Sequence, residues 1–337
     1  MQVKIKKLKL ATLLTTIILL AFVVAGHASD QSSKTGMRTT AGAPVMLKIG
    51  TAPIGGAQYT MGIALEQLWI SKAPGIKISS QSTGGSVQNI NLIGDKEVQI
   101  GFTATTLARL ALAGEGPYKG NQVKSLRILS YVYPALFHLV VVNKPQYKTV
   151  RDLKGETISC GEIGSVMDYQ FRQLVASAGM KDSDFKIEHL SHQDAADAIK
   201  DGHIAGLFYA TSVPNSVITE LLMGGKTKIL GLDAATIKKG VAANPDLYAS
   251  EIPAKTYPNM NENLPTIAGS YVLVVDAGVP EDAVYQLTKI IYENHDALVK
   301  QHKFFSYTTL KNSMYGLGGV ALHPGALKYY REKGVVK

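Results

Sequence analysis

Short apolar runs alternate with segments of helical periodicity in the first part of the chain. The runs at 45–50, 76–82 and 97–103 are rich in aliphatic residues and predict buried strands. Each run is followed by a stretch in which apolar residues recur every three or four positions, and this spacing predicts a helix. Strands that alternate with helices are typical of parallel βαβ units, so the pattern indicates an α/β protein.

The same alternation returns in the middle of the chain. Four further strands are predicted there, over 156–161, 186–190, 204–210 and 228–232. Helices are expected between them, and Gly179 and Gly202 are stop signals for two of these helices. The segment 233–266 contains four prolines and shows no regular pattern. After it, 281–302 and 323–334 are expected to be helical.

Two long stretches rich in β-branched and aromatic residues, 125–144 and 267–275, flank the middle block. The first is too long for one average strand, and Pro134 interrupts it. Two βαβ blocks joined by two extended segments predict two lobes, with chain crossings near 130–140 and 266–278. A chain that leaves one lobe, builds the second and returns creates a cleft between lobes that move about a hinge.

The crossings set the expected lobe boundaries. Lobe 1 would comprise residues 46–133 and 277–337, and lobe 2 would comprise residues 134–276. About 290 residues follow the polar N-terminal segment, a length that suits one large domain or two smaller ones.

The first 28 residues have the layout of a secretory signal peptide. Four lysines precede residue 10, an apolar run covers 10–25, and small residues follow it. Cleavage is expected after Ala28, or alternatively after Ala25. The other interpretation is an uncleaved membrane anchor, but this run is shorter than the roughly 20 residues that span a bilayer. We expect export, with residues 29–45 as a flexible polar leader.

Charge and cysteine content exclude some classes. The net charge is +9, and removing the four N-terminal lysines leaves 31 basic against 26 acidic residues. No basic cluster remains in the mature part, so nucleic-acid binding is not expected. Cys160 is the single cysteine, and therefore no intramolecular disulfide can form in this exported chain.

Small polar residues follow five of the predicted strands. The five loops are 51–59, 82–86, 103–106, 161–165 and 209–214. Ligands of open α/β sheets bind outside the carboxyl ends of strands, where the free N–H groups of helix N-termini favour anions. One such loop is compatible with an ordinary turn, but five of the same character predict a shared binding cleft.

The glycine-rich loop after the first strand raises the question of a nucleotide site. Gly50 and Gly55 have the spacing of a phosphate-binding loop, but that motif continues with Lys and then Ser or Thr. This chain has Gly56 and Ala57 instead. The dinucleotide pattern G-x-G-x-x-G also fails, because Ala52 stands in place of its second glycine. Neither phosphate motif is present, and no cofactor is expected.

Catalytic and metal-binding constellations are weak. His189 and His192 are three residues apart, but the local pattern is a strand running into a loop, with no third ligand evident nearby. Cys160 ends a predicted buried strand without an evident base, which favours a packing role. Asp194 and Asp197 are interpreted as solvated helix charges. No local nucleophile–base motif exists, so we expect neither an enzyme nor a metal site, although a spatial arrangement of distant residues stays open.

His138 lies inside the first long apolar stretch, close after Pro134. Its position at the expected crossing makes it a candidate to face the cleft. The alternative is a hydrogen-bonded histidine in the sheet.

Six stretches together resemble one family. They are "IGTAPIGGAQY", "STGGSVQNINLI", "VQIGFTATTLARLALAGEGPY", "YPALFHLVVV", "DLKGETISCGEIGS" and "GVPEDAVYQLTKIIYEN". In this order they resemble the TAXI group of extracytoplasmic solute-binding proteins, which serve TRAP transporters. The resemblance covers residues 46–335. It implies a two-lobed type II periplasmic-binding-protein fold with a ligand cleft between the lobes and a periplasmic location.

The resemblance also implies a ligand and a partner. Ligands of the family are small organic acids, such as glutamate-like and other five-carbon dicarboxylates. The partner would be the small and large TRAP membrane subunits, sometimes fused, which use an ion gradient. Residues carried over as ligand contacts are Gln58, Tyr59, Thr83, Gly85, Ser86, Thr103, Thr105, Gly164, Ser165, Thr211 and Pro214.

Two segments depart from the family pattern. Residues 52–54 replace part of the glycine-rich first loop, and residues 166–167 stand where the family often has Gly-Thr. Both departures leave the ligand identity open. Arg109 is the arginine nearest to a predicted cleft loop, and we expect it to be a solvated residue on a helix surface.

Two other functions fit the same chain. The protein could serve an ATP-driven importer or a signalling receptor. The genes that lie next to its own gene would decide between these systems. It could also be an enzyme on a bilobal scaffold, which turnover of the bound ligand would reveal.

Overall fold

The computed structural model describes residues 44–337. The predicted signal peptide and nearly all of the leader lie outside the described residues. The first βαβ block is present as expected, in the order β1 (Val45–Gly50), α1 (Ala57–Lys72), β2 (Ile76–Gln81), α2 (Ser86–Gly94), β3 (Ile100–Ala104) and α3 (Thr105–Ala113). Helix α3 ends at Gly114, whose φ of 71° is the left-handed conformation that glycine adopts readily at such ends.

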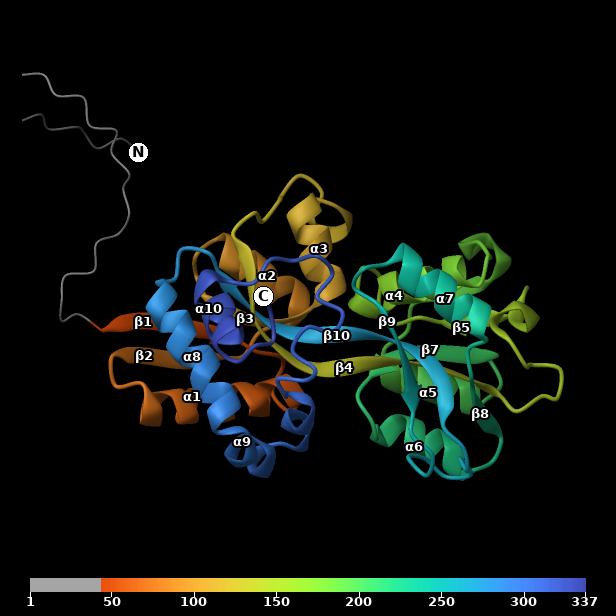
Figure 1. Ribbon diagram of the computed structural model, residues 1–337. Coiled ribbons are helices and arrows are strands. Elements are labelled where there is room, and N and C mark those ends of the chain that lie inside the picture. Colours follow the sequence, from red (N-terminus) through yellow and green to blue (C-terminus); the bar gives the residue numbers. More distant parts are fainter. Residues whose placement is uncertain (1–43) are drawn as a thin grey trace, which may run out of the picture. The chain divides into compact units, whose positions relative to one another are not determined.

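Two long strands, β4 (Leu126–Val142) and β10 (Leu264–Asp276), run side by side and antiparallel through the centre of the fold (Figure 1). The second block lies between them and comprises β5 (Thr157–Ser159), α4 (Val166–Ser177), β6 (Lys186–Glu188), α5 (His192–Lys200), β7 (Gly206–Thr211), α6 (Ser216–Met223), β8 (Thr227–Leu230), α7 (Ala234–Ala243) and β9 (Tyr248–Ile252). The chain ends with α8 (Glu281–Glu293), α9 (His295–Gln301) and α10 (Pro324–Glu332).

The strands share one sheet of order β2-β1-β3-β10-β4-β7-β5-β6, with β8 on β4 and β9 on β10. Strands β1 to β3 are parallel, and so are β5, β6 and β7. Strand β10 pairs with β3 through Tyr271–Val275 and with β9 through Leu264–Ala268. Strand β10 therefore pairs with strands of both blocks, whereas β4 pairs with β10 and with β7 and β8 of the second block.

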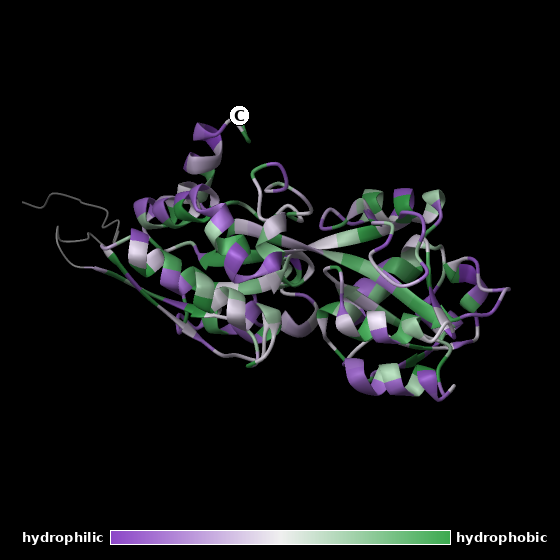
Figure 2. Cartoon of the chain, turned by 90° about the horizontal axis from the view of Figure 1, so that it is seen from below, coloured by the Kyte–Doolittle hydropathy of each residue, from purple (hydrophilic) through white to green (hydrophobic). Residues whose placement is uncertain are grey.

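Buried hydrophobic residues form four clusters. Two of them draw on residues 47–133 and 272–330, and two on residues 135–268, with Val166 as the one exception. We call these two groups of residues the first half and the second half. Hydrophobic residues follow the central strands, whereas hydrophilic residues lie mainly on outer helices and loops (Figure 2). All four clusters lie within one compact unit, Ala43–Lys337.

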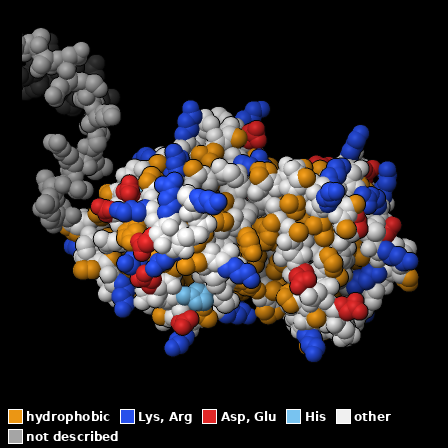
Figure 3. Space-filling view, viewed as in Figure 1, with side chains coloured by type: hydrophobic (Ala, Val, Ile, Leu, Met, Phe, Trp, Pro, Cys, Tyr) orange, Lys and Arg blue, Asp and Glu red, His pale blue; other side chains and the backbone are white. Residues whose placement is uncertain are grey.

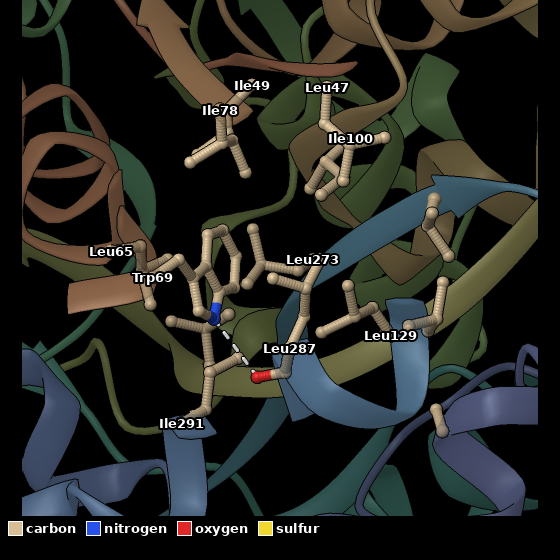
Figure 4. Close-up of a cluster of buried hydrophobic side chains, with 14 of the residues drawn as sticks. Leu47, Ile49, Leu65, Trp69, Ile78, Ile100, Leu129, Leu273, Leu287 and Ile291 are labelled. Atoms are coloured by element: carbon tan, nitrogen blue, oxygen red, sulfur yellow. Dashed lines mark hydrogen bonds between the residues drawn. The ribbon is translucent and has the colours of Figure 1, made fainter. Parts of the chain in front are cut away.

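The C-terminal helices return to the first half. Trp69 of α1 is fully buried, and its Nε1 donates to the carbonyl oxygen of Leu287 in α8 over 3.0 Å (Figure 4). The side chains of Leu65 and Ile291 lie in the same cluster. This packing joins segments 218 residues apart and closes the first half.

Three sequence-based expectations need correction. Pro134 does not interrupt β4, because β7 pairs with β4 only from Leu136 onward and a residue without N–H is tolerated where a strand neighbour is missing. The segment 233–266 is not irregular throughout, since it holds α7 and β9. The predicted helix 281–302 is two helices, separated at Asn294, whose φ and ψ of −121° and 27° are not helical.

Candidate functional site

The carboxyl ends of parallel strands carry the five predicted loops. Strands β1, β2 and β3 lead into α1, α2 and α3 in the first half, and β5 and β7 lead into α4 and α6 in the second. Val166 at the start of α4 packs in the same hydrophobic cluster as residues of α2 and α3. The loop after β5 therefore lies against first-half helices, as a shared site requires.

Asn89 joins two loops of the first half to strand β3. Its Nδ2 donates to the carbonyl oxygens of Thr51 and Phe102, both over 2.8 Å. Its Oδ1 accepts from Thr83 Oγ1 at 2.7 Å. The residue is fully buried, so these bonds fix the loops after β1 and β2 relative to strand β3. Asn89 lies inside a helix, and no sequence signal pointed to it.

The sequence predicted Thr83, Gly85 and Ser86 as ligand contacts. The Thr83 hydroxyl donates to Asn89 and accepts from Gly85 N–H at 3.2 Å, so it holds the loop. Gly85 has a φ of 94°, a conformation that other residues rarely adopt. Ser86 is half-buried at the first position of α2. Of these three, only the side chain of Ser86 is accessible.

Thr103 and Thr105 are both fully buried. The Thr105 hydroxyl donates to the carbonyl oxygen of Ser270 on β10 over 3.3 Å. The Thr103 hydroxyl approaches only the neighbouring carbonyl oxygen of Ala104, at 3.4 Å. In this conformation both threonines stabilise the junction of α3 with the central strands and expose no group to a ligand, which departs from the expectation.

Tyrosine side chains from three strands gather beside Gln58. Gln58 Nε2 donates to the Tyr133 hydroxyl over 2.9 Å, and the rings of Tyr133 and Tyr271 have centroids 4.9 Å apart. Burial, followed by the nearby Tyr271 and Tyr209, raises the pKa of Tyr133 well above its usual value. Burial raises the pKa of Tyr271 as well, and Tyr209 adds to the effect. Tyr209 lies on β7, which pairs with the strand β4 that carries Tyr133, and Tyr59 is half-buried next to Gln58 in α1.

Two properties determine how Tyr133, Tyr209 and Tyr271 can form hydrogen bonds: their burial and the availability of the Tyr133 hydroxyl proton. All three tyrosines are neutral, because desolvation disfavours the phenolate. Gln58 occupies an acceptor site of Tyr133, so the hydroxyl proton of Tyr133 is free to be donated. The group therefore offers neutral hydrogen-bond donors and aromatic surface. The sequence pattern indicated Gln58 but not Tyr133, Tyr209 or Tyr271, because a tyrosine within an apolar strand cannot be distinguished by sequence from a residue of the hydrophobic core.

The loop before α4 supplies Gly164 and Ser165. The Ser165 hydroxyl caps α4 by accepting from Asp168 N–H at 3.3 Å, and Gly164 N–H donates to Asp168 Oδ2 at 3.2 Å. Gly164 has a φ of 74°. Both residues are half-buried. The cap uses the Ser165 oxygen as acceptor and leaves its hydroxyl proton available to a ligand.

Cys160, Asp168 and His189 converge behind this loop, with ligand atoms within 4.8 Å of one another. The Cys160 thiol lies 3.7 Å from Asp168 Oδ1, which also pairs with Arg172 at 2.9 Å. Burial, helped by Asp168, raises the pKa of the thiol to about 12. A metal ion would have to displace the thiol proton and compete with Arg172, so the group as it stands is a thiol–carboxylate–guanidinium network.

The loop after β7 presents Tyr209, Thr211 and Pro214. The ring of His192 stacks on Tyr209 with centroids 4.0 Å apart, and its Nε2 lies 2.8 Å from Met167 Sδ. Thr211 is half-buried at the end of β7, and Pro214 is exposed. His192, the first residue of α5, thus contacts both α4 and β7. The sequence pattern had suggested only a weak metal ligand at this position.

His138 is a packed histidine of the sheet. It is fully buried, and its Nδ1 donates to the carbonyl oxygens of Leu136 and Tyr209, at 2.9 and 3.2 Å. Its Nε2 accepts from the Tyr257 hydroxyl at 3.1 Å. Burial lowers its pKa to about 4, against these carbonyl bonds. Both ring nitrogens are occupied, so His138 has none to offer a ligand and the alternative interpretation describes it correctly.

Two cavities are present in the described part of the chain, and Thr106 of the predicted loop 103–106 borders the smaller one. One of about 660 Å³ is bordered by residues of α6, β8 and the segment 258–264. Another of about 290 Å³ lies between α3 and α4, with Arg109 and Arg172 among its lining residues. Neither is lined by a predicted ligand contact. Basic and acidic side chains are interspersed on the face that Figure 3 shows, with hydrophobic groups gathered near its middle.

Comparison with protein families gives a match over residues 49–334 to the model of the NMT1-like family. The chain belongs to the NMT1-like family. Among residues 44–337, none of the helices combines the length and the apolar character needed to cross a membrane.

Solved structures share the fold of this NMT1-like chain. A TctC solute-binding protein from Polaromonas matches with a TM-score of 0.51 and 16% identity, covering 88% of this chain and 100% of that one. A Xanthomonas citri protein bound to ATP matches with a TM-score of 0.54 and 12% identity, over 86% and 96% of the two chains. The sulphonate-binding protein SsuA of Escherichia coli gives a TM-score of 0.49 at 16% identity, over 86% and 84%. The expected fold class, a mixed α/β fold of the periplasmic binding proteins, is confirmed.

Proposed function

We propose that this protein is an exported, non-enzymatic receptor that binds a small organic acid between two lobes. The observation that carries the proposal is that strand-end segments of the two halves meet: Val166, at the start of α4, packs against residues of α2 and α3, while Gln58 bonds to Tyr133 on the central strand β4. Neutral hydroxyl and amide donors bind a carboxylate without the desolvation of a full positive charge. The half-buried Ser165 and Thr211 add hydroxyls from the second half.

The proposed lobes follow the hydrophobic clusters. The clusters favour lobe 1 as residues 46–133 and about 272–337, since Val272–Val275 pair with β3. Lobe 2 would then be residues 134–271. Because Val166 already packs against first-half residues, a solute would enter only after the lobes separate. Closure then adds second-lobe donors to a solute held by the first lobe.

The finer proposal concerns the ligand and the partner. We propose a five-carbon dicarboxylate, glutamate-like in form, delivered to TRAP membrane subunits. This proposal rests on the sequence resemblance. The five predicted loops contain no Lys or Arg, so hydroxyl and backbone N–H groups would bind the carboxylates. Export and a periplasmic location rest on residues 1–28, which lie outside the described part.

Isothermal titration of the full mature chain tests the proposal. The protein is unfolded and refolded to strip bound solute, and is then titrated with L-glutamate, 2-oxoglutarate, four-carbon dicarboxylates, an alkanesulfonate and a sugar. We expect binding of at least one dicarboxylate. Binding of the sulfonate or the sugar alone would overturn the ligand class. Turnover of a bound acid would overturn the receptor function.

A further inference from the structure

We propose that a buried hydrogen-bonded network around Asp246 holds the two halves in the closed conformation and so sets the affinity for the solute. The network comprises Thr106, Arg109, Gln173 and Asp246. The inference rests on the proposed function for the consequence on solute affinity, whereas its effect on conformation does not need a ligand.

The geometry places Asp246 at a junction. Its side chain has no exposed surface. Its Oδ2 accepts from Thr106 Oγ1 at 2.6 Å and from Gln173 Nε2 at 3.1 Å, and its Oδ1 pairs with Arg109 Nε at 3.2 Å. A fully buried carboxylate needs such partners, because an unpaired charge in the interior is strongly unfavourable.

The partners come from both halves of the fold. Thr106 and Arg109 lie on α3 of the first half, one turn apart, and Gln173 lies on α4 of the second. Asp246 lies two residues before the start of β9 in the second half. Moving the halves apart would separate the carboxylate from Thr106 and Arg109. Arg109 was expected from the sequence to be a solvated residue on a helix surface. In the structure only 33% of its side chain is exposed.

The contact between the two halves at Asp246 has features of one that can form and break reversibly. The cavity of about 290 Å³ lies beside the network, lined by Arg109, Tyr169 and Gln173 among others. Oε1 of Gln170 and Oε1 of Gln173 are buried without a hydrogen-bond partner in the described residues. Unfilled space and unsatisfied acceptors reduce the free energy gained on contact. Water reaches Arg109, so solvent can replace its partner when the halves separate.

The consequence is a coupling between this network and the solute site. A solute that needs the closed form binds with an apparent affinity reduced by the fraction of closed molecules. Weakening the network lowers that fraction and leaves the bond between Gln58 and Tyr133 in place, since the hydrogen bonds of the network do not include either residue. Thr105, next in sequence to Thr106, bonds to β10, so the network lies beside the central strands on which the halves would pivot.

The experiment compares two arginine variants. Arg109→Met removes the guanidinium of the network, and Arg151→Met removes one from the exposed Arg151–Asp233 pair, which lies entirely in the second half. Small-angle scattering without solute is expected to show a larger radius of gyration for R109M than for R151M and the wild type. Titration with L-glutamate and 2-oxoglutarate is expected to show affinity roughly fivefold or more weaker for R109M only.

Two results would overturn the inference. One is scattering of R109M that matches the wild type. The other is an unchanged affinity of R109M for an acid that the wild type binds. Asp246→Asn, which keeps the shape, and Thr106→Val provide second variants, and circular dichroism reports whether each folds. If no acid binds the wild type, the proposed function fails, while the scattering comparison still decides the conformational part.

Discussion

The side-chain amide of Gln58 lies 2.9 Å from the hydroxyl oxygen of Tyr133, a residue 75 positions later in the chain. The first belongs to the helix after the glycine-rich loop, and the second to a central strand. Because Gln58 donates this bond, the hydroxyl proton of Tyr133 is not used in it and can be donated to another group. The bond links a residue suggested by sequence to a group that only the fold assembles.

Replacing Tyr209 by Phe is expected to weaken solute binding with little loss of stability. The change removes one hydroxyl from the ligand space and keeps the ring that stacks on His192. The loss of one neutral hydrogen bond is about 1 kcal/mol, or roughly fivefold in Kd. Titration calorimetry measures it. Tyr285→Phe, on α8 of the first half, is the matched control, and equal effects of both variants would contradict the proposed site.

His138 is expected to make stability fall in acid. Its pKa is about 4 in the folded state, below the usual 6.5 of the unfolded chain, so the unfolded state binds more protons between these values. Its contribution is present above pH 6.5 and is lost as the pH falls toward 4. The loss is about 3 kcal/mol. Urea unfolding at pH 7.5 and pH 4.5 measures it.

His138→Gln is the variant for this prediction. It should be less stable than the wild type at pH 7.5 but should lose less stability between the two pH values. His203→Gln, at an exposed turn position, is the control and should follow the wild type. The same acid-dependent loss in H138Q and the wild type would show that His138 is not responsible.

Cys160 is expected to react slowly with thiol reagents in the native protein. The thiol is fully buried, and with a pKa of about 12 it carries little thiolate at pH 8. Reaction with Ellman's reagent should be far slower than for a Cys160→Ser, Ser71→Cys variant, whose new thiol lies at an exposed position of α1. In urea the two proteins should react alike. A fast native reaction would mean that the loop around Cys160 opens readily.

Gly50→Ala is expected to destabilise the fold by about 1–3 kcal/mol. A Cβ at residue 50 would lie 2.4 Å from Asn89 Oδ1, and Asn89 cannot move without breaking its bonds to the strand-end loops. Gly75→Ala is the control, because a Cβ there meets nothing within 4 Å. Its effect should stay within about 1 kcal/mol. Thermal unfolding compares the two, and similar melting temperatures would contradict the structural role given to Asn89.

The apolar patterns predicted the order of strands and helices because each strand and helix of a βαβ unit carries its own periodic set of buried apolar residues. The patterns failed where tertiary contacts determine whether a segment forms a strand or a helix. Pro134 stays inside β4 because the neighbouring strand β7 pairs with β4 only from Leu136 onward. Helix α7 was missed because its start depends on Asp233, whose side chain accepts from Thr236 N–H at 2.9 Å, in a segment that prolines made look irregular.

The sequence by itself determined the α/β class, the βαβ blocks and the loops at strand ends, because these follow from local periodicity and from glycine and serine at turns. Only the tertiary structure decided which side chains meet. It buried Thr105 and His138, gathered Gln58 with three tyrosines, and moved Arg109 from an expected surface to a pair with Asp246. The Gln58–Tyr133 and Arg109–Asp246 contacts join residues 75 and 137 positions apart, and no local pattern encodes a distance in space between such residues.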